Sequence, residues 1–362
     1  MLRFMSETNA FTPLRVGATT IRNRLSMAPM TRSRATEEGL ATASTAEYYR
    51  QRAGAGLIVT EATQISPRAK SYPTTPGIGT PEQAQSWRQV TDAVHEAGGT
   101  IHLQLFHGGR TGHPTMRGGL AAHAPSAVPA PGQTFTPDGM RDHEVPVAMT
   151  GQDIRNTLQD FATASALAVL AGFDGVQLHA ANGYLPQQFL CRNSNLRTDE
   201  WGGSTENRVR FVVEAVRAMA GAAGADRTSL RISPASTIQG IDEGNPDELY
   251  EALLGELAGD GLAFLDVSET PGHRDLTTRL RKSWPGVLVL NPHRDAEPQA
   301  PHDRVDDGLA AGADVVALGA AWLANPDLAE RIARRGPYNE PDGSTFYGGT
   351  DAGYLDYPLL VA

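Results

Sequence analysis

Hydrophobic residues in this sequence occur as short runs that alternate with longer segments of mixed polarity. Short runs rich in Val, Ile and Leu are typical of strands that are buried on both faces of a parallel sheet. The runs predict eight strands, at Arg24–Met27, Gly56–Thr60, Thr100–Leu105, Gly175–Leu178, Leu230–Ser233, Ala263–Val267, Val287–Leu290 and Val315–Leu318.

The segments between these runs carry the spacing of amphipathic helices. In Glu206–Ala220, apolar residues recur three and four positions apart, which places them on one face of a helix. Ser204 or Thr205 is the expected N-cap of this helix. The same pattern predicts helices at Ala84–Ala97 and Asp153–Ala171.

Eight strand–helix alternations favour a parallel sheet closed into a (β/α)8 barrel, or TIM barrel. An open doubly wound sheet that binds a nucleotide would carry a GxGxxG turn after an early strand, and this sequence has none there. The length of 362 residues fits a barrel, because such barrels run from about 250 to beyond 400 residues when they carry insertions. We therefore expect residues 1–362 to form a single barrel domain.

An irregular stretch at about residues 106–149 separates the third and fourth predicted strands and is rich in Gly, Pro and His. It is too long for a simple connection and lacks the apolar periodicity of a separate domain. We expect it to form a lid or hairpin that caps the barrel. The tail after Pro337 is expected to be a second cover rather than part of the barrel.

The charge balance and the single cysteine narrow the kinds of partner. The formal net charge is −10, from 41 acidic and 31 basic residues, which argues against nucleic acid or an anionic membrane and favours a small-molecule substrate. Cys191 is the only cysteine, so an internal disulfide and a thiolate metal cage are excluded. The histidines lack metal-ligand spacing, and we predict no metal site.

Targeting signals are not apparent in the sequence. The N-terminus has no apolar core of the kind found in signal peptides. The best apolar run, residues 161–173, is interrupted by Thr163 and Ser165 and is shorter than the ~20 residues that a membrane span needs. We therefore expect a cytoplasmic protein, and the sequence leaves open whether it is a monomer or a homodimer.

Three side chains with hydrogen-bonding chemistry follow the fourth predicted strand: His179, Asn182 and Tyr184. An imidazole and a carboxamide can both donate to one oxygen, and a phenol can give up a proton. Together they could polarise a conjugated C=C bond through its carbonyl or nitro oxygen and protonate one of its carbons. Packing and turn formation explain the same residues, because Asn before Gly is a common turn device. Catalysis here needs a cofactor that carries hydride.

Polar residues follow several other predicted strands. Each alone can be explained by hydrogen bonds to loop backbone, but in a barrel the carboxyl ends of all strands meet at one mouth. Their occurrence at several strands therefore favours a functional site. These residues are Thr31, Glu61, Gln104, His107, Arg231, Ser268 and Glu269, and the small residue Ala62 lies beside Glu61.

The motifs at these positions resemble those of the Old Yellow Enzyme family of flavin-dependent ene-reductases, from Phe11 to nearly the end of the chain. They are LHAANGYL and SNLRTDEWGGSTENR in Leu178–Arg208, APMTR in Ala28–Arg32, TEATQ in Thr60–Gln64, QLFHGGR in Gln104–Arg110, RISP in Arg231–Pro234 and FYGGTDAGYLDYP in Phe346–Pro358.

This resemblance implies a role for each candidate residue. His179 and Asn182 would bind the substrate oxygen, and Tyr184 would be the proton donor. The residues implied to contact the flavin ring are Pro29, Met30, Thr31, Ala62, Gln104 and Arg231. Gln104 suits the pyrimidine edge of the ring, Arg231 suits the negative charge near N1, and Thr31 suits the carbonyl near N5. The residues implied to form walls of the substrate pocket are Tyr72, Phe106 and Tyr354.

The cofactor phosphate region departs from the family pattern. Family members hold the phosphate with a glycine-rich turn after the seventh strand and a Gly-Arg pair after the eighth. This chain has Asn291-Pro292-His293-Arg294 at the first position and Gly319-Ala320 at the second. Arg294 or His293 could compensate for the lost cation. A tailed 5-deazaflavin, whose phosphodiester needs an open exit, is an alternative to FMN.

We therefore predict a flavin-dependent ene-reductase that transfers hydride from NADPH or NADH, through FMN, to the C=C bond of α,β-unsaturated carbonyl or nitro compounds. Two alternatives remain open on the sequence alone. One is a redox-neutral isomerase or desaturase of a biosynthetic pathway that uses the same site. The other is a binding protein that keeps the pocket but has lost the cofactor.

Overall fold

The computed structural model describes residues 9–293 and 299–360. Within these residues, eight parallel strands close into a barrel in chain order, the fourth pairing with the third and the eighth with the first. They are β3 (Leu25–Met27), β4 (Leu57–Val59), β6 (Ile101–Phe106), β11 (Gly175–Ala180), β12 (Thr228–Ile232), β13 (Phe264–Ser268), β14 (Leu288–Asn291) and β15 (Val315–Leu318). Each coincides with one of the eight predicted runs, so the predicted (β/α)8 barrel is confirmed.

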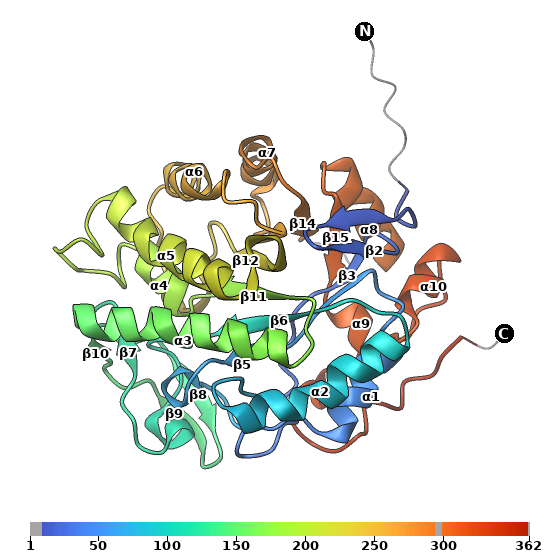
Figure 1. Cartoon of the computed structure of the whole chain (residues 1–362), viewed down its shortest axis with the longest axis horizontal. Helices are drawn as coiled ribbons and strands as arrows, with labels where there is room; N and C mark the ends of the chain where they lie inside the picture. The colour runs from blue at the N-terminus through green and yellow to red at the C-terminus, as the bar shows by residue number, and fades with distance from the viewer. Residues whose placement is uncertain (1–8, 294–298, 361–362) are drawn as a thin grey trace, which may run out of the picture.

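Helices lie around the outside of this barrel, and Figure 1 shows α2, α3 and α5 running across its outer face. The helices are α1 (Ala43–Gln51), α2 (Pro81–Glu96), α3 (Gly151–Leu170), α4 (Leu185–Leu190), α5 (Thr205–Ala223), α6 (Pro246–Leu257), α7 (Arg274–Ser283), α8 (Pro301–Ala310), α9 (Ala320–Ala324) and α10 (Leu328–Ala333). Short 3₁₀ turns lie at η1 (Pro67–Ala69), η2 (Pro114–Arg117), η3 (Ala225–Arg227), η4 (Ile238–Gly240) and η5 (Gly343–Thr345). Among the helices of the described residues, none combines the length and the apolarity that crossing a bilayer requires.

Capping residues determine where the predicted helices begin. Ser204 is the N-cap of α5 and accepts a hydrogen bond from the backbone of Asn207, as an N-cap serine should. Helix α2 begins earlier than predicted because Thr80 caps it and Pro81 occupies its first position, where proline is favoured. The apolar face of α5, predicted from spacing, is buried against the barrel and against α3.

Two apolar cores lie on the two sides of the barrel wall, one outside the strands and one inside the barrel. The larger lies between the strands and the helices. The smaller fills the barrel interior and includes Val16 and Ile21 from an N-terminal hairpin of β1 (Leu14–Val16) and β2 (Thr19–Ile21). Because this end of the interior is packed with apolar side chains, the polar residues at the carboxyl ends of the strands gather at the opposite end.

The stretch between β6 and α3 contains a β-hairpin, as the sequence suggested. Strands β8 (Gln133–Thr136) and β9 (Gly139–Asp142) form the antiparallel hairpin, while β7 (His123–Ala124) and β10 (Val147–Ala148) pair in parallel at its base. The remaining short strand, β5 (Thr63–Gln64), pairs with β6.

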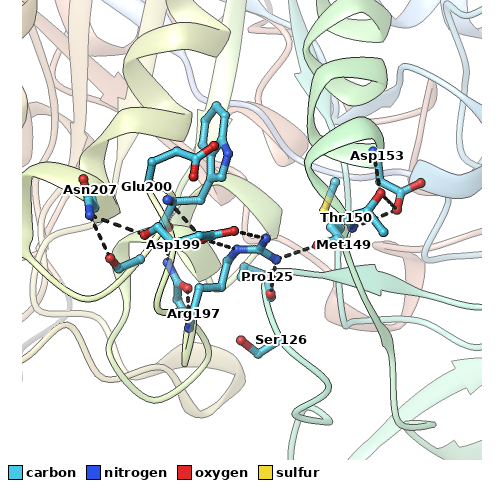
Figure 2. A network of polar contacts seen from close by, with 12 residues as sticks. Pro125, Ser126, Met149, Thr150, Asp153, Arg197, Asp199, Glu200 and Asn207 are labelled. Carbon is cyan, nitrogen blue, oxygen red and sulfur yellow. Dashed lines mark hydrogen bonds and ion pairs between the residues drawn. The ribbon is translucent and has the colours of Figure 1, made fainter.

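One arginine ties both ends of this hairpin segment to the loop after α4. The guanidinium of Arg197 donates to the backbone carbonyls of Pro125, at 3.0 Å, and Met149, at 2.5 Å. The same guanidinium donates two hydrogen bonds to the Asp199 carboxylate, at 2.9 and 2.5 Å. Figure 2 shows this network. Bidentate pairing fixes the orientation of a guanidinium, so Arg197 anchors the base of the hairpin segment.

Candidate active site

A cavity of about 350 Å³ opens at the carboxyl ends of the barrel strands. Its walls bring together most of the predicted site residues, from β3, β4, β6, β11 and β15 and the loops that follow them. The lining residues are Pro29, Met30, Thr31, Ala62, Gln104, His179, Asn182, Tyr184, Gly319, Ala320, Leu323, Phe346 and Tyr347.

The loop after β11 is bent so that Asn182 and Tyr184 face this cavity together with His179. Asn182 and Gly183 have positive φ angles of 55° and 78°, a conformation that Gly adopts freely and Asn tolerates. A Cβ at Gly183 would approach the carbonyl oxygen of Ile238 to 2.7 Å, so only glycine fits. The carboxamide of Gln187 accepts from the backbone N–H of Gly183 at 2.8 Å and holds the turn in place.

His179 is a neutral imidazole. Its side chain is buried, and burial, followed by the nearby Arg231, lowers its pKa to about 3. A neutral ring carries one N–H donor and one acceptor nitrogen. Its Nδ1 is buried without a hydrogen-bond partner among the described residues, and a buried polar atom of this kind calls for a partner that the protein itself does not supply.

Tyr184 lies edge-on to two other rings. Its ring centroid is 4.9 Å from that of His179 and 4.6 Å from that of Phe106, both with T-shaped geometry. Burial raises the pKa of Tyr184 well above its usual value of 10, so the phenol holds its proton at any ordinary pH. Its hydroxyl is 2.9 Å from the hydroxyl of Tyr72.

A second cavity of about 760 Å³ adjoins the first, because Thr31, Tyr184 and Tyr347 line both. Its walls are mostly apolar and include a residue of the β8–β9 hairpin, Phe135, whose side chain is otherwise exposed. The lining residues are Thr31, Ser33, Tyr72, Pro73, Thr74, Phe135, Tyr184, Tyr347, Gly348 and Gly349. Phe135 was not among the residues singled out from the sequence, because its only signal is a large aromatic side chain in a hairpin that is mostly polar.

A chain of hydrogen bonds crosses the barrel next to the first cavity. The Gln104 carboxamide donates to Gln177 at 2.8 Å, and Gln177 donates to Asp266 at 3.0 Å. Asp266 accepts two bonds from Arg231, both at 2.7 Å, and Arg231 also donates to Asn291 at 3.1 Å. We call these five residues the polar chain. They connect five strands of the barrel and are Gln104 (β6), Gln177 (β11), Asp266 (β13), Arg231 (β12) and Asn291 (β14).

Arg231 does not line the cavity as the structure presents it. Its side chain is buried and paired with Asp266, which balances its charge. It is the strand neighbour of His179 in the β11–β12 register, and its electrostatic effect on that imidazole follows from this position. The contact between Arg231 and a flavin ring therefore stays a prediction.

The prediction that Tyr354 forms a wall of the substrate pocket is wrong. Its side chain is fully buried, stacked on Tyr48 with 4.2 Å between ring centroids. The guanidinium groups of Arg32 and Arg34 lie over the same ring, so cation–π contacts hold it in the core. From the tail, Phe346 and Tyr347 reach the cavity instead. The tail has no periodicity that distinguishes these aromatic residues from Tyr354.

The phosphate region has a different basic residue from those expected. Arg294 lies outside the described residues. His293 is a weak cation, because burial and nearby arginines lower its pKa. Arg304, in the first turn of α8, donates to the carbonyl of Pro292 at 2.6 Å. Among the described residues, no carboxylate forms an ion pair with Arg304.

Arg304 is held where two strands end. Pro292 follows β14 and Gly319 follows β15, and these parallel strands are paired neighbours. The Asn291 carboxamide joins their ends by donating to the carbonyl of Ala317 at 2.9 Å. Arg304 therefore lies at the same edge of the barrel as Gly319, which lines the cavity.

Comparison with known proteins identifies the class of this protein. The model of the NADH:flavin oxidoreductase / NADH oxidase family matches residues 9–339. The chain belongs to this family, which confirms the resemblance to the Old Yellow Enzymes. It is an FMN-dependent oxidoreductase.

The relatives cover almost the whole chain. A probable flavin mononucleotide-dependent alkene reductase of Leishmania infantum is 40% identical over 96% of this chain and 96% of its own length. Rice 12-oxophytodienoate reductase 1 is 36% identical, over 96% of this chain and 92% of its own. The structure of morphinone reductase matches with a TM-score of 0.92 and 40% identity, covering 99% of this chain and 98% of its own.

Proposed function

We propose that this protein reduces the C=C bond of α,β-unsaturated carbonyl or nitro compounds, with NADH or NADPH as the source of hydride. The observation that carries the proposal is the convergence of a neutral imidazole, a carboxamide and a protonated phenol on one cavity, from His179, Asn182 and Tyr184. Donors of this kind act on an oxygen that gains negative charge during the reaction.

The cavity has the donors and acceptors that a flavin ring requires. Gln104 uses one N–H of its carboxamide in the polar chain, which leaves its carbonyl oxygen for an N–H of the pyrimidine edge. Thr31 lines the same cavity, and its hydroxyl can act as donor or acceptor. When bound, FMN takes hydride from the reduced nicotinamide and supplies it to the substrate.

His179 and Asn182 bind the carbonyl or nitro oxygen of the substrate. Both donate hydrogen bonds, and the neutral state of His179 means that it donates without giving up a proton to the oxygen. This polarises the conjugated bond and makes its β-carbon electrophilic. The two bonds strengthen as charge moves onto the oxygen, which is the property that lowers the barrier.

Tyr184 supplies the proton to the α-carbon. Its raised pKa prevents ionisation in the resting protein, so the proton is present whenever substrate binds. As hydride reaches the β-carbon, the α-carbon becomes basic enough to take this proton. The T-shaped contacts with His179 and Phe106 fix the plane of the phenol.

Arg304 holds the phosphate of FMN. It lies at the edge formed by the ends of β14 and β15, its charge has no described carboxylate partner, and it has donors beyond the one that binds Pro292. An arginine in the first turn of a helix opposes the helix dipole, which a bound dianion would offset. This assigns to α8 the cation that family members place after the eighth strand, where this chain has Ala320.

The substitution Tyr184→Phe tests the central step. We expect the enone to be reduced about 10²–10⁴-fold more slowly, since that is the usual contribution of a general acid. Reduction of the flavin by NADPH needs no proton from Tyr184 and should be nearly unchanged. Stopped-flow absorbance measures the two half-reactions separately, and equal slowing of both would remove Tyr184 from the role of proton donor.

The alternatives give different results in the same experiments. A redox-neutral isomerase or desaturase would bind the flavin but oxidise NADPH poorly. A protein that had lost its cofactor would be colourless and would not take up FMN. An absorption spectrum of the purified protein, followed by the mass of the extracted chromophore, distinguishes these cases.

A further inference from the structure

The contact between two phenols carries an inference that rests on the proposed function and goes beyond it. Tyr72 lies in the loop between η1 and α2, and its hydroxyl is 2.9 Å from that of Tyr184. The two rings are nearly perpendicular, at 85°, with centroids 6.5 Å apart. Among the described residues, the hydroxyl of Tyr72 is the only hydrogen-bond partner of the Tyr184 hydroxyl.

The direction of this hydrogen bond decides whether Tyr184 can act. Each hydroxyl has one proton and can donate only one hydrogen bond. If Tyr184 donated to Tyr72, its proton would point away from the substrate. If Tyr72 donates to Tyr184, the proton of Tyr184 is free to point at the α-carbon, and its oxygen gains a donor for the charge that forms there.

We propose that Tyr72 donates to Tyr184 and relays the replacement proton, so that two protons move when the substrate is protonated. The O–H bond of Tyr184 breaks as a C–H bond forms at the α-carbon. The O–H bond of Tyr72 breaks as its proton moves to the Tyr184 oxygen. The resulting Tyr72 phenolate then takes a proton from water that enters the second cavity, which Tyr72 lines, and the bulk buffer neutralises the hydroxide that forms.

The surroundings of the two hydroxyls support this route. The Tyr184 ring packs edge-on against His179 and Phe106, so an anion left on its oxygen would be poorly solvated on that side. Tyr184 borders both cavities, whereas Tyr72 borders only the wider one, of about 760 Å³, beside Thr74 and Ser33. Passing the charge to Tyr72 moves it away from these rings and towards the wider cavity. Tyr72 touches the reaction through Tyr184, so we class it as a positioning residue.

The test is the variant Tyr72→Phe, which keeps the ring and removes the hydroxyl. We expect the single-turnover rate of enone reduction to fall about tenfold to hundredfold, as for loss of a hydrogen bond to a charged group, with flavin reduction by NADPH unchanged. In mixtures of H₂O and D₂O, the wild-type rate should depend on deuterium content along a curve, because two protons move. The variant should give a straight line.

The matched control is Tyr338→Phe, which removes another phenol hydrogen bond, the 2.8 Å contact with His302, away from the cavities. It should keep both the rate and the curved dependence. A straight line or no isotope effect in the wild type would overturn the relay. So would a Tyr72→Phe variant that changes only KM and keeps the curve, since this would assign Tyr72 a purely steric role. Wild-type protein that fails to reduce any enone would instead refute the proposed function.

Discussion

At the scale of single residues, the arginine that the motifs indicate is not the one whose positive charge lacks a carboxylate partner. Arg231 is neutralised by Asp266, whereas Arg304, outside every motif, has no described carboxylate partner. Motifs specify which residue type follows a strand. They do not specify which charges meet in space, because this depends on strand register and on helices far along the chain.

The variant Arg304→Gln tests the phosphate assignment. Loss of a charge-assisted bond costs roughly 1.5–3 kcal/mol, so we expect the Kd for FMN to rise about tenfold to hundredfold. Riboflavin, which lacks the phosphate, should bind to wild type and variant alike. Quenching of flavin fluorescence by the apoprotein measures both affinities without reference to activity.

The control for this experiment is Arg279→Gln, a change on the outer surface, where Arg279 pairs with Asp247. It should leave both affinities unchanged. An Arg304→Gln variant that loses FMN and riboflavin affinity equally would show that Arg304 supports the fold of the site rather than the phosphate.

At the scale of elements, the sequence predicts the barrel well and its covers poorly. Parallel strands are buried on both faces, so each appears as an apolar run, and the helices show their face by spacing. The hairpin segment has neither signal, since its two strands are short and largely polar. Tyr354 was misplaced for the same reason: an irregular tail gives no indication of which aromatic residue turns inward.

The variant Arg197→Ala tests how the hairpin segment is held. Removing the guanidinium releases the carbonyls of Pro125 and Met149 together with Asp199. We expect amide hydrogens in residues 123–148 to exchange about tenfold faster or more, as for loss of a hydrogen bond to a charged group, while those of the barrel strands keep their protection.

Arg192→Ala is the matched control, because it removes an arginine of the same loop whose pair with Asp242 is largely exposed. Exposed pairs contribute little to stability, so exchange should not change. If Arg197→Ala leaves the hairpin as protected as before, or exposes the barrel equally, Arg197 does not act as its anchor.

At the scale of the whole molecule, buried titratable groups set the response to acid. Burial lowers the pKa of His102 to about 4 and the pKa values of His107 and His179 to about 3. Below about pH 6.5 the unfolded chain binds three protons that these folded imidazoles do not bind, so the free energy of unfolding decreases as the pH is lowered. Glu61 acts in the opposite direction, since burial raises its pKa to about 7 and the folded protein retains its proton where the unfolded chain releases it.

These three imidazoles and this carboxyl together leave a net difference of two protons between about pH 6.5 and pH 4.5. The lowered pKa values of His123, His143 and His293 act in the same direction, and the raised pKa of Glu243 acts against it. The net difference of two protons predicts that the free energy of unfolding decreases by about 3 kcal/mol for each unit of acidification in this range. Urea titrations at several pH values and constant ionic strength measure it. A stability that stays level or increases on acidification would contradict the burial of these imidazoles.

The polar chain, which reaches the cavity through Gln104, forms a single cooperative unit beside it. Gln177 and Asp266 each serve neighbours on both sides, and Asn291 passes the connection on to β15. Replacing one of these residues therefore leaves a buried polar partner without its hydrogen bond. This lowers the free energy of unfolding by more than the loss of one hydrogen bond would. We therefore expect these five positions to change only through coupled substitutions in evolution, even where the residues that line the cavity change independently.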